Sequence, residues 1–190
     1  MKFFGLGMGV LMSLILGSAS ANAIEEPEYE VVELIGEVEI REYAPRIVAV
    51  TTLASNSDTT GGFRRLADYI FGGNSAGKSI AMTAPVEETL GVPEPLMAFT
   101  MPAEYTMAEL PEPDNEAVTL REVDARTVAV TQFSGWATAG RVARAERELR
   151  EALAQRDITV TGAATLNQYN PPWTLPFLRR NEVMVPVATR

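Results

Sequence analysis

The eleven residues from Arg41 to Thr51, REYAPRIVAVT, return as REVDARTVAVT from Arg121 to Thr131. Seven of the eleven positions are identical, and the offset is 80 residues throughout. Each copy ends in a run of β-branched and small apolar residues, which is typical of a buried strand. In both places an amphipathic helix and two further strand-like runs follow. The chain is therefore predicted to contain two related β-α-β-β halves, at about 28–102 and 117–188, joined by a Pro- and Glu-rich linker.

The residue pattern after each copy predicts the helices and strands. The first helix stops at Gly72-Gly73 and has an apolar stripe formed by Phe63, Leu66, Ala67, Ile70 and Phe71. The second runs from Thr138 to Gln155, and its buried side is formed by Val142, Ala145, Leu149 and Leu153. The strand-like runs are 80–86, 96–101, 164–169 and 182–187. Because two such units are too few for a solenoid, we expect them to close on each other around one shared core.

The segment Gly72–Ser79, GGNSAGKS, matches the phosphate-binding loop pattern G-x-x-x-x-G-K-[ST] letter for letter. Such a loop binds phosphate only where a buried strand precedes it and a helix N-terminus follows it. Here the predicted order is reversed, because the segment follows a helix and precedes a strand. We therefore interpret Gly72-Gly73 as the end of the helix and Lys78 as part of a surface loop, and we predict no nucleotide site.

The composition excludes several classes of site. The 190 residues include no histidine and no cysteine, which rules out Ser-His-Asp and Cys-His catalysis, ordinary zinc sites and histidine-ligated haem. The formal net charge of −9 argues against nucleic acid and anionic membranes as partners. Glu87-Glu88 and the repeat-related Glu42 and Glu122 are acidic pairs without a nucleophile–base constellation. No catalytic or metal-binding residue is predicted, and the chain is interpreted as a non-enzyme.

Residues 1–23 have the pattern of a cleavable secretory signal. Lys2 precedes a mostly apolar stretch from Phe3 to Leu16, and small residues lead to an A-x-A exit at Ala21-Asn22-Ala23. The apolar stretch is too short for a membrane span. We expect cleavage after Ala23, a single monomeric domain over 24–190 without a membrane span, and a periplasmic or secreted location. An uncleaved N-terminal anchor is the alternative.

The segment from Tyr169 to Val183, YNPPWTLPFLRRNEV, is an unusual connection between strands. Three prolines restrict its backbone and make it stiff. The same segment carries large apolar side chains, namely Trp173, Leu175, Phe177 and Leu178. Two interpretations have equal weight from composition alone: these side chains plug one end of the fold, or they form a wall of a flat apolar binding site.

The order and spacing of several motifs resemble those of the SOUL haem-binding proteins. The motifs are YIFGGN at 69–74, IAMTAPV at 80–86, FTMP at 99–102, QFSG at 132–135 and YNPPW…PFLRRNEV at 169–183. The resemblance covers the chain from about Glu28 to Val187. It implies an α+β fold, a distorted antiparallel β-barrel of two pseudo-symmetric β-α-β-β repeats with two flanking helices, like that of gyrase-inhibitor-like ligand-binding domains.

The resemblance also implies a ligand and a site. In the family, haem or a related tetrapyrrole is taken to lie in an exposed cleft between the first helix and the late proline-rich loop. Carried over by position, the candidate cofactor-binding residues are Phe63, Arg64, Leu66, Ala67, Ile70, Trp173, Phe177 and Arg179. Basic positions beside the propionates fall here on Asp68 and Thr174, which leaves Arg64, Arg65 and Arg179 as the candidate cations. The helical residues can also be read as core, and Arg179 and Arg180 as braces that pair with Glu182 and other carboxylates.

The expected function is that of a non-enzymatic carrier or buffer, which binds haem or a tetrapyrrole in an apolar surface cleft without a histidine ligand. Three alternatives remain open at this point. They are a binding domain for another flat apolar small molecule on a gyrase-inhibitor-like scaffold, a carboxylate-based hydrolase, and a purely structural or partner-binding protein.

Overall fold

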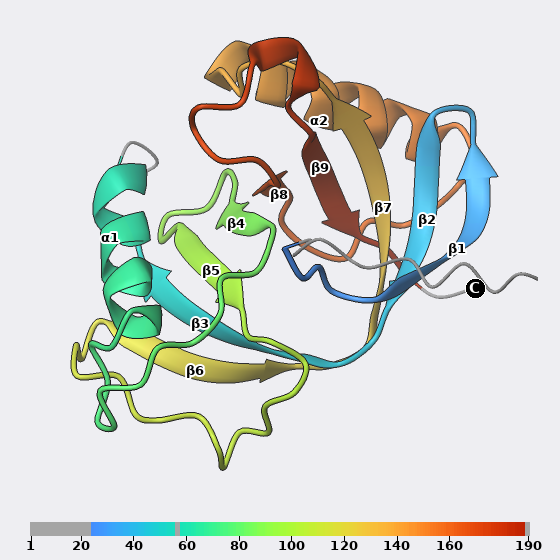
Figure 1. The fold of residues 1–190 in the computed structure, drawn as a ribbon. Coiled ribbons are helices and arrows are strands. Elements are labelled where there is room, and N and C mark those ends of the chain that lie inside the picture. Colours follow the sequence, from blue (N-terminus) through green and yellow to red (C-terminus); the bar gives the residue numbers. More distant parts are fainter. Residues whose placement is uncertain (1–23, 56–57, 189–190) are drawn as a thin grey trace, which may run out of the picture.

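The computed structural model describes residues 24–55 and 58–188 (Figure 1), so the predicted signal peptide lies outside the described residues. Nine strands form one antiparallel sheet in the order β1-β2-β7-β9-β8-β4-β5-β3-β6. The strands are β1 (Tyr29–Ile35), β2 (Val38–Tyr43), β3 (Arg46–Thr52), β4 (Val86–Thr89), β5 (Leu96–Thr100), β6 (Val118–Val123), β7 (Arg126–Phe133), β8 (Thr165–Gln168) and β9 (Asn181–Pro186). The helices are α1 (Thr59–Ile70), α2 (Ala139–Ala154) and the short 3₁₀ helix η1 (Pro176–Leu178). The sheet curls into a half-barrel with the two long helices outside it, which confirms the predicted α+β distorted barrel.

The two repeated segments pair with each other in one long ribbon. β2 pairs with β7 and β3 pairs with β6, so that Tyr43 faces Arg126 on one side of the corner at Ala44-Pro45 and Arg46 faces Val123 on the other. The register is unchanged across the corner, where proline has no N–H to donate to a ladder. Each predicted half thus lends a strand to the other, and neither is a separate unit. The duplication itself stays a prediction.

The helix side of the sheet has two apolar clusters, and the prediction of one shared core was wrong. α1 covers a cluster formed by Ala49, Leu53, Leu66, Tyr69, Ile70, Ile80, Met97, Phe99, Met101, Leu110 and Val118. α2 covers a second one formed by Ile35, Val38, Ile40, Ala129, Val142, Ala145, Leu149, Leu153, Ala164, Leu166, Val183, Val185 and Val187. The clusters are separate because each helix packs on its own half of the sheet, so that Leu166 of β8 belongs to the α2 cluster whereas Val86 of β4 packs against the α1 cluster.

Helix α1 lies very close to the strands beneath it. Gly62 makes this approach possible, because a Cβ atom at this position would lie only 2.2 Å from the Cδ2 atom of Leu53. The helix ends at Ile70, and Gly72 has a φ of 113°, a backbone conformation that favours glycine. The predicted helix end at Gly72-Gly73 is therefore confirmed.

Helix α2 agrees with its prediction in extent and orientation. It begins after the cap residue Thr138 and ends before Gln155, and the four residues predicted to be buried are buried. The ion pair between Arg144 and Glu148, at 2.8 Å, lies on its exposed side.

The segment Gly72–Ser79 is a turn after α1, as predicted. The Asn74 side chain is buried and holds the turn, because its Nδ2 donates to the carbonyls of Tyr69 and Lys78 at 2.9 and 2.7 Å. The exposed Lys78 places its Nζ 4.5 Å from the ring centre of Tyr105. Lys78 thus belongs to a surface loop and not to a phosphate-binding cradle.

The strand predicted over 80–86 was wrong for most of its length, since β4 begins only at Val86. The preceding residues bond to several different elements. The Ile80 N–H donates to the carbonyl of Ile70 in α1, and the Thr83 hydroxyl donates to the carbonyl of Thr100 in β5. The apolar and β-branched residues of this segment therefore pack between α1 and the sheet, and they do not form a strand with continuous pairing.

Candidate functional site

The predicted site residues on α1 fall into two groups. Leu66 and Ile70 are almost fully buried in the cluster under the helix, so neither can contact a ligand at the surface, and their assignment to a cofactor site is corrected to core. Phe63 is 39% exposed, Ala67 is half-buried and Arg64 is exposed. The stripe of Phe63, Leu66, Ala67 and Ile70 spans both the buried side and the flank of one helix, which periodicity alone could not separate.

The proline-rich loop between β8 and β9 presents its apolar side chains to solvent. Trp173 is 83% exposed and Phe177 is 72% exposed, and Leu175 and Leu178 are exposed as well. The interpretation that these side chains plug one end of the fold is therefore wrong. Soluble proteins rarely expose several large apolar side chains in one segment, and where they do the surface is commonly a binding site.

Arg179 holds this loop in shape from within. Its Nε donates to the carbonyl of Thr174 at 2.9 Å, and its Nη2 donates to the carbonyl of Pro172. Its guanidinium also lies 3.8 Å from the ring centre of Trp136, an exposed residue just before α2. Arg179 thus braces the loop through carbonyls and an aromatic ring, rather than through carboxylates as predicted. The sequence analysis missed Trp136, whose position next to the loop no local pattern indicates.

Strand register places α1 and the loop on the same face of the sheet. Phe63 lies edge-on to Phe99 of β5, with ring centres 5.3 Å apart. Phe99 faces Val86 of β4, and Val86 faces Gln168 of β8, after which the loop begins. Directly opposed residues of antiparallel strands project to the same side. With strands about 4.8 Å apart, the two steps from Phe99 to Gln168 span about 10 Å.

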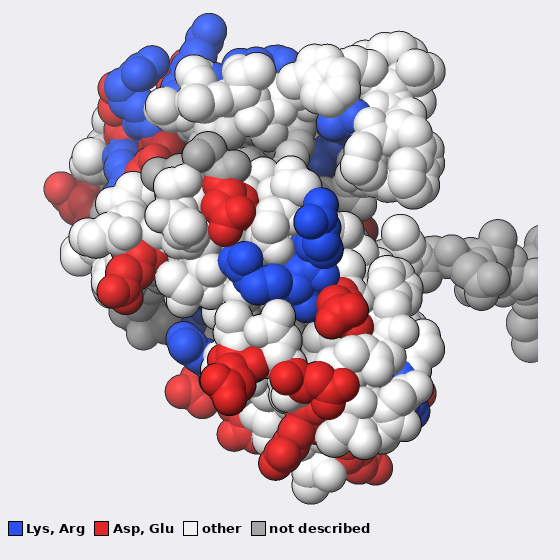
Figure 2. Space-filling model, turned by 90° about the vertical axis from the view of Figure 1, so that its left-hand side faces the viewer, with Lys and Arg blue, Asp and Glu red and all other residues white. Residues whose placement is uncertain are grey.

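The surface between α1 and the loop is not covered by either helix. Three side chains of β4 and β8 project there, and none of them is buried; we call Val86, Glu88 and Gln168 the central strip. Figure 2, which shows the side of the molecule where α1 lies, has a lobe of uncharged side chains projecting at its upper right, above a group of Lys and Arg side chains. The face between helix and loop is therefore open and partly apolar.

Glu88 is a carboxyl group without a protein partner in this strip. It faces Met97 of β5 and Leu166 of β8, each of which is buried under its own helix. Within residues 24–55 and 58–188 it makes no hydrogen bond or ion pair. Burial raises the pKa of the Glu88 carboxyl above its ordinary value. An unpaired carboxyl in apolar surroundings does not stabilise the fold.

Glu88→Gln is expected to stabilise the protein at pH 7 more than at pH 4. Because the folded pKa is raised, the wild type loses stability as the pH rises from the unfolded pKa through the folded one, whereas the amide stays neutral. Urea unfolding at both pH values gives the difference between variant and wild type. Glu37→Gln, in the exposed turn between β1 and β2, serves as the control. A difference that is the same at both pH values would contradict the assignment.

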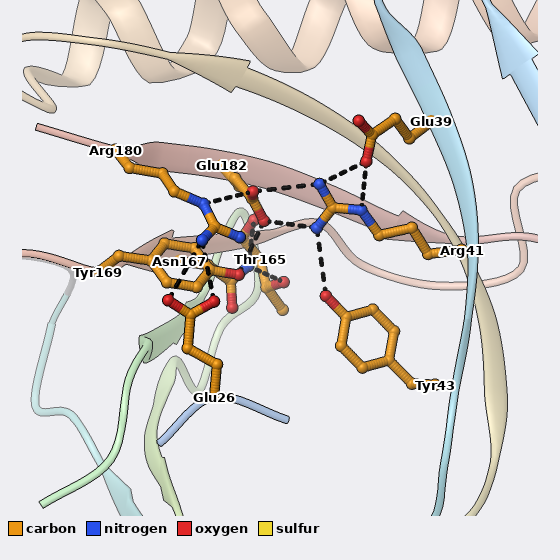
Figure 3. A network of polar contacts seen from close by, with 9 residues as sticks. All are labelled: Glu26, Glu39, Arg41, Tyr43, Thr165, Asn167, Tyr169, Arg180 and Glu182. Carbon is orange, nitrogen blue, oxygen red and sulfur yellow. Dashed lines mark hydrogen bonds and ion pairs between the residues drawn. The ribbon is translucent and has the colours of Figure 1, made fainter. Parts of the chain in front are cut away.

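The inner face of the sheet, opposite the helices, carries a buried network of charges (Figure 3). Its centre is Glu182 of β9, whose exposed fraction is 0%. The Glu182 carboxylate accepts hydrogen bonds from Arg41 at 2.9 and 3.2 Å, from Arg180 at 2.9 Å and from the Tyr169 hydroxyl at 2.8 Å. Arg180 reaches Glu26 as well, at 2.9 Å, so the predicted pairing of Arg180 with Glu182 and a further carboxylate is confirmed.

The network shifts the proton equilibria of its members in one direction. Burial, followed by the charge of Glu182, raises the pKa of Tyr169. Burial by itself lowers the pKa of Arg41, but the hydrogen bonds and the charge of Glu182 more than offset this and raise it overall. The charge of Glu182 likewise helps to raise the pKa of Arg180, so both arginines and the tyrosine keep their protons. Among the described residues no group of three or more acidic side chains could hold a metal ion.

Comparisons with known proteins agree with this fold. Heme-binding protein 1 from Bos taurus is 28% identical over 126 residues, which cover 63% of this chain and 65% of that protein's length. The crystal structure of the EcmrR C-terminal domain has a TM-score of 0.63 at 12% identity, over 85% of this chain and 99% of that domain. A hydrolase from Listeria innocua has a TM-score of 0.56 at 10% identity, over 88% and 94%. At these identities the two structures show the likeness of the fold alone.

No helix in the described part of the chain is long and apolar enough to cross a membrane. The family model of the SOUL heme-binding protein matches residues 24–186, which include every described strand and helix. The motifs that carried the resemblance lie within that range, from the last turn of α1 to the first residues of β9. The chain therefore belongs to the SOUL heme-binding protein family.

Proposed function

We propose that this protein binds haem or a related tetrapyrrole on the central strip, between α1 and the proline-rich loop, as a non-enzymatic carrier or buffer. Family membership supports haem as the ligand. The observation that carries the site is the exposure of Trp173 and Phe177 on a loop stiffened by prolines and by Arg179. A preformed apolar surface loses little conformational freedom when a flat ligand covers it.

At the proposed site one cation of the described residues, Arg64, is free to pair with a carboxylate at the edge of the ligand. Arg65 is engaged by the Thr51 hydroxyl, the Thr52 carbonyl and Asp58. Arg64, by contrast, is exposed and makes no hydrogen bond or ion pair within 24–55 and 58–188. We assign it to a propionate. Because the chain has no histidine, binding would depend on apolar contact and this one cation, and we expect an affinity on the order of micromolar.

Trp173→Ala is expected to weaken hemin binding about tenfold or more. Burying one large aromatic side chain against a ligand contributes roughly 1.5–3 kcal/mol, and 1.4 kcal/mol corresponds to a factor of ten. The measurement is a titration with hemin, followed by the Soret absorbance and by quenching of tryptophan fluorescence. In the variant the fluorescence comes from Trp136, since it is the other of the two tryptophans.

Leu34→Ala is the matched control for this variant. Leu34 is 67% exposed on the edge strand β1, far in the sheet order from the strands that carry the loop. Its removal takes away a comparable exposed apolar group without touching the proposed site. Equal loss of affinity in both variants, or no loss in Trp173→Ala, would overturn this location of the site.

A second candidate is a flat apolar molecule without carboxylate arms. Asp68 and Thr174 stand at positions where the family resemblance places basic residues, and this favours a ligand of lower negative charge. A porphyrin that lacks carboxylates distinguishes the two. If it binds as tightly as hemin, and Arg64→Gln changes neither, the second candidate replaces the first.

The arrangement of the carboxylates supports a non-enzymatic role. Glu87 and Glu88 project to opposite faces of β4, so they cannot act as an acid–base pair on one substrate. Glu42 and Glu122 are both exposed and lie on the two sides of the ribbon's corner, where Glu42 faces Thr127 and Glu122 faces Ile47. Two carboxyl groups that share a reacting bond must lie within one site.

The proposal includes a periplasmic or secreted location and a monomeric state. The pattern of residues 1–23, with Lys2, an apolar stretch and the A-x-A exit, supports secretion. Native mass spectrometry of the protein purified from its own compartment tests the cleavage site, the monomeric state and the bound ligand. The expected result is a single chain that begins at Ile24 and carries a tetrapyrrole mass.

A further inference from the structure

Two arginines at equal places in the sequence repeat meet at one carboxylate on the inner face. Arg46 and Arg126 are the sixth residue of the two repeated segments, at an offset of 80 residues. The Nη2 atom of Arg46 lies 3.0 Å, and that of Arg126 3.2 Å, from the same Oε2 atom of Glu87. Two positive charges thus share one negative charge, and the group as a whole is left with a surplus positive charge.

The hydrogen bonding of this group is incomplete as well. The Arg46 side chain is only 10% exposed, yet its Nε and Nη1 have no partner within the described residues, and neither does the Nε of Arg126. Burial, opposed by the charge of Glu87 but assisted by that of Arg126, lowers the pKa of Arg46. Buried charges are normally paired and fully hydrogen-bonded. A buried guanidinium with unpartnered N–H groups can donate charge-assisted hydrogen bonds to an anionic group of a ligand.

Arg46 lies between two cavities. One, of about 670 Å³, is bounded by the N-terminal segment before β1 and by the two corners of the central ribbon, and its inner wall contains Ile47, Met101 and Tyr105. The other is small, about 10 Å³, and is lined by Glu87, Tyr43 and Asn167 among others. Pro27, Arg46 and Thr100 line both cavities, so these three residues form the partition between them.

The larger cavity is strongly polarised in charge. The residues around it include five exposed carboxylates, which are Glu25, Glu26, Glu28, Glu122 and Asp124, whereas Arg46 is the cation among its lining residues. A simple anion would meet repulsion from these carboxylates, and a simple cation would leave Arg46 uncompensated. A ligand with both charges satisfies both ends at once.

We propose that the cavity of about 670 Å³ binds a small zwitterion, such as an ω-amino acid, whose carboxylate pairs with Arg46 and whose ammonium group lies among the acidic residues. The aliphatic part of such a ligand packs on Ile47, Met101 and Tyr105. The cavity shares no lining residue with α1, the central strip or the proline-rich loop, so the two assignments are independent.

The N-terminal segment controls access to the buried N–H groups of Arg46. The carbonyl of Glu25 accepts from the Ala84 N–H at 2.8 Å, and the carboxylate of Glu26 binds Arg180 at 2.9 Å. Pro27 follows these two attachments directly and forms part of the partition. Pro27 is therefore the residue that must move for a ligand carboxylate to reach the buried Nε and Nη1 atoms of Arg46.

The test is calorimetric titration of the full mature chain with three probes of equal length: 6-aminohexanoate, hexanoate and hexylamine. Saturable binding is expected for 6-aminohexanoate, binding at least about fivefold weaker for hexanoate, and none for hexylamine. Arg46→Gln is expected to weaken the binding of 6-aminohexanoate about tenfold or more, because a charge-assisted hydrogen bond is lost. Arg144→Gln, in an exposed ion pair on α2, is the matched control and leaves the affinity unchanged.

Glu87→Gln gives an effect of opposite sign and guards against a folding artefact. Without the carboxylate of Glu87, Arg46 and Arg126 have no competing anion, so 6-aminohexanoate is expected to bind about tenfold more tightly. Two variants that change the same ion group in opposite directions cannot both act through loss of structure. Absence of binding by the wild type, equal binding of all three probes, or weakened binding in Glu87→Gln would overturn the proposal. Hemin titration of the same samples is unaffected in every case.

Discussion

Glu182→Ala is expected to lower the free energy of unfolding by about 3–5 kcal/mol, because it leaves buried charges without their partner. Arg41 is only 3% exposed and directs two hydrogen bonds at the lost carboxylate. Arg180 and Tyr169 lose an acceptor at the same time. Urea unfolding at pH 7 measures the effect, which is a large part of the roughly 5–15 kcal/mol typical of a folded domain.

Glu148→Ala is the control for this variant. Glu148 accepts from Arg144 at 2.8 Å, a distance close to those around Glu182, but the pair is exposed on α2. Its loss is expected to change the free energy of unfolding by about 0.5 kcal/mol or less. If the two substitutions had equal effects, burial would not be the cause, and the network would be ordinary surface pairing.

A double variant distinguishes the stabilisation by the Arg41–Glu182 pair from the cost of leaving one buried charge unpaired. Arg41→Leu combined with Glu182→Leu removes both partners, so no buried guanidinium of β2 is left without an anion. Arg180 keeps Glu26 at 2.9 Å. The double variant is therefore expected to be more stable than Glu182→Ala alone, and the same urea experiment shows it.

The parts of the fold that the sequence predicted well have strong local signals. The buried side of α2 repeats at helical spacing over four residues, and the helix end at Gly72 needs a backbone conformation that favours glycine. The stiffness of the loop around Trp173 follows from its prolines. Family resemblance supplied the rest, which was the barrel and the relation between α1 and that loop.

Other parts depend on pairing between distant strands and have no local signal. The network around Glu182 joins residues 141 positions apart, from β2 and β9. Arg41 opens the first copy of the repeat and is buried, whereas its counterpart Arg121 is exposed, so the repeat itself could not indicate which arginine is internal. Arg46 and Arg126 both reach Glu87 because the two halves pair strand with strand, β2 with β7 and β3 with β6, and this pairing has no local sequence signal.

The two faces of the sheet therefore have different tasks. The helix side has two apolar cores and, between them, the uncovered central strip beside the loop. The inner side carries the buried charged residues Arg41, Arg46 and Glu182. Alternation along β4 sends Glu88 to the first face and Glu87 to the second, so one strand separates a surface suited to a flat apolar ligand from one suited to charged groups.

Leu66→Ala is expected to lower the free energy of unfolding by about 2–5 kcal/mol and to leave hemin affinity unchanged. Leu66 is fully buried under α1, and its truncation opens a cavity among Tyr69, Ile70 and Met97. It has no surface with which to contact a ligand. Urea unfolding gives the first quantity, and hemin titration at a temperature well below the unfolding midpoint gives the second.

Phe63→Ala, three residues earlier on the same helix, is expected to reverse this pattern. Phe63 is 39% exposed and borders the central strip through its contact with Phe99, so its loss removes ligand contact and only part of a packing interaction. Hemin binding should weaken while stability falls by less than in Leu66→Ala. The opposite result, normal stability but weak hemin binding in Leu66→Ala, would mean that α1 turns a different side to the ligand. Register and exposure together thus decide which members of one apolar stripe can belong to a site.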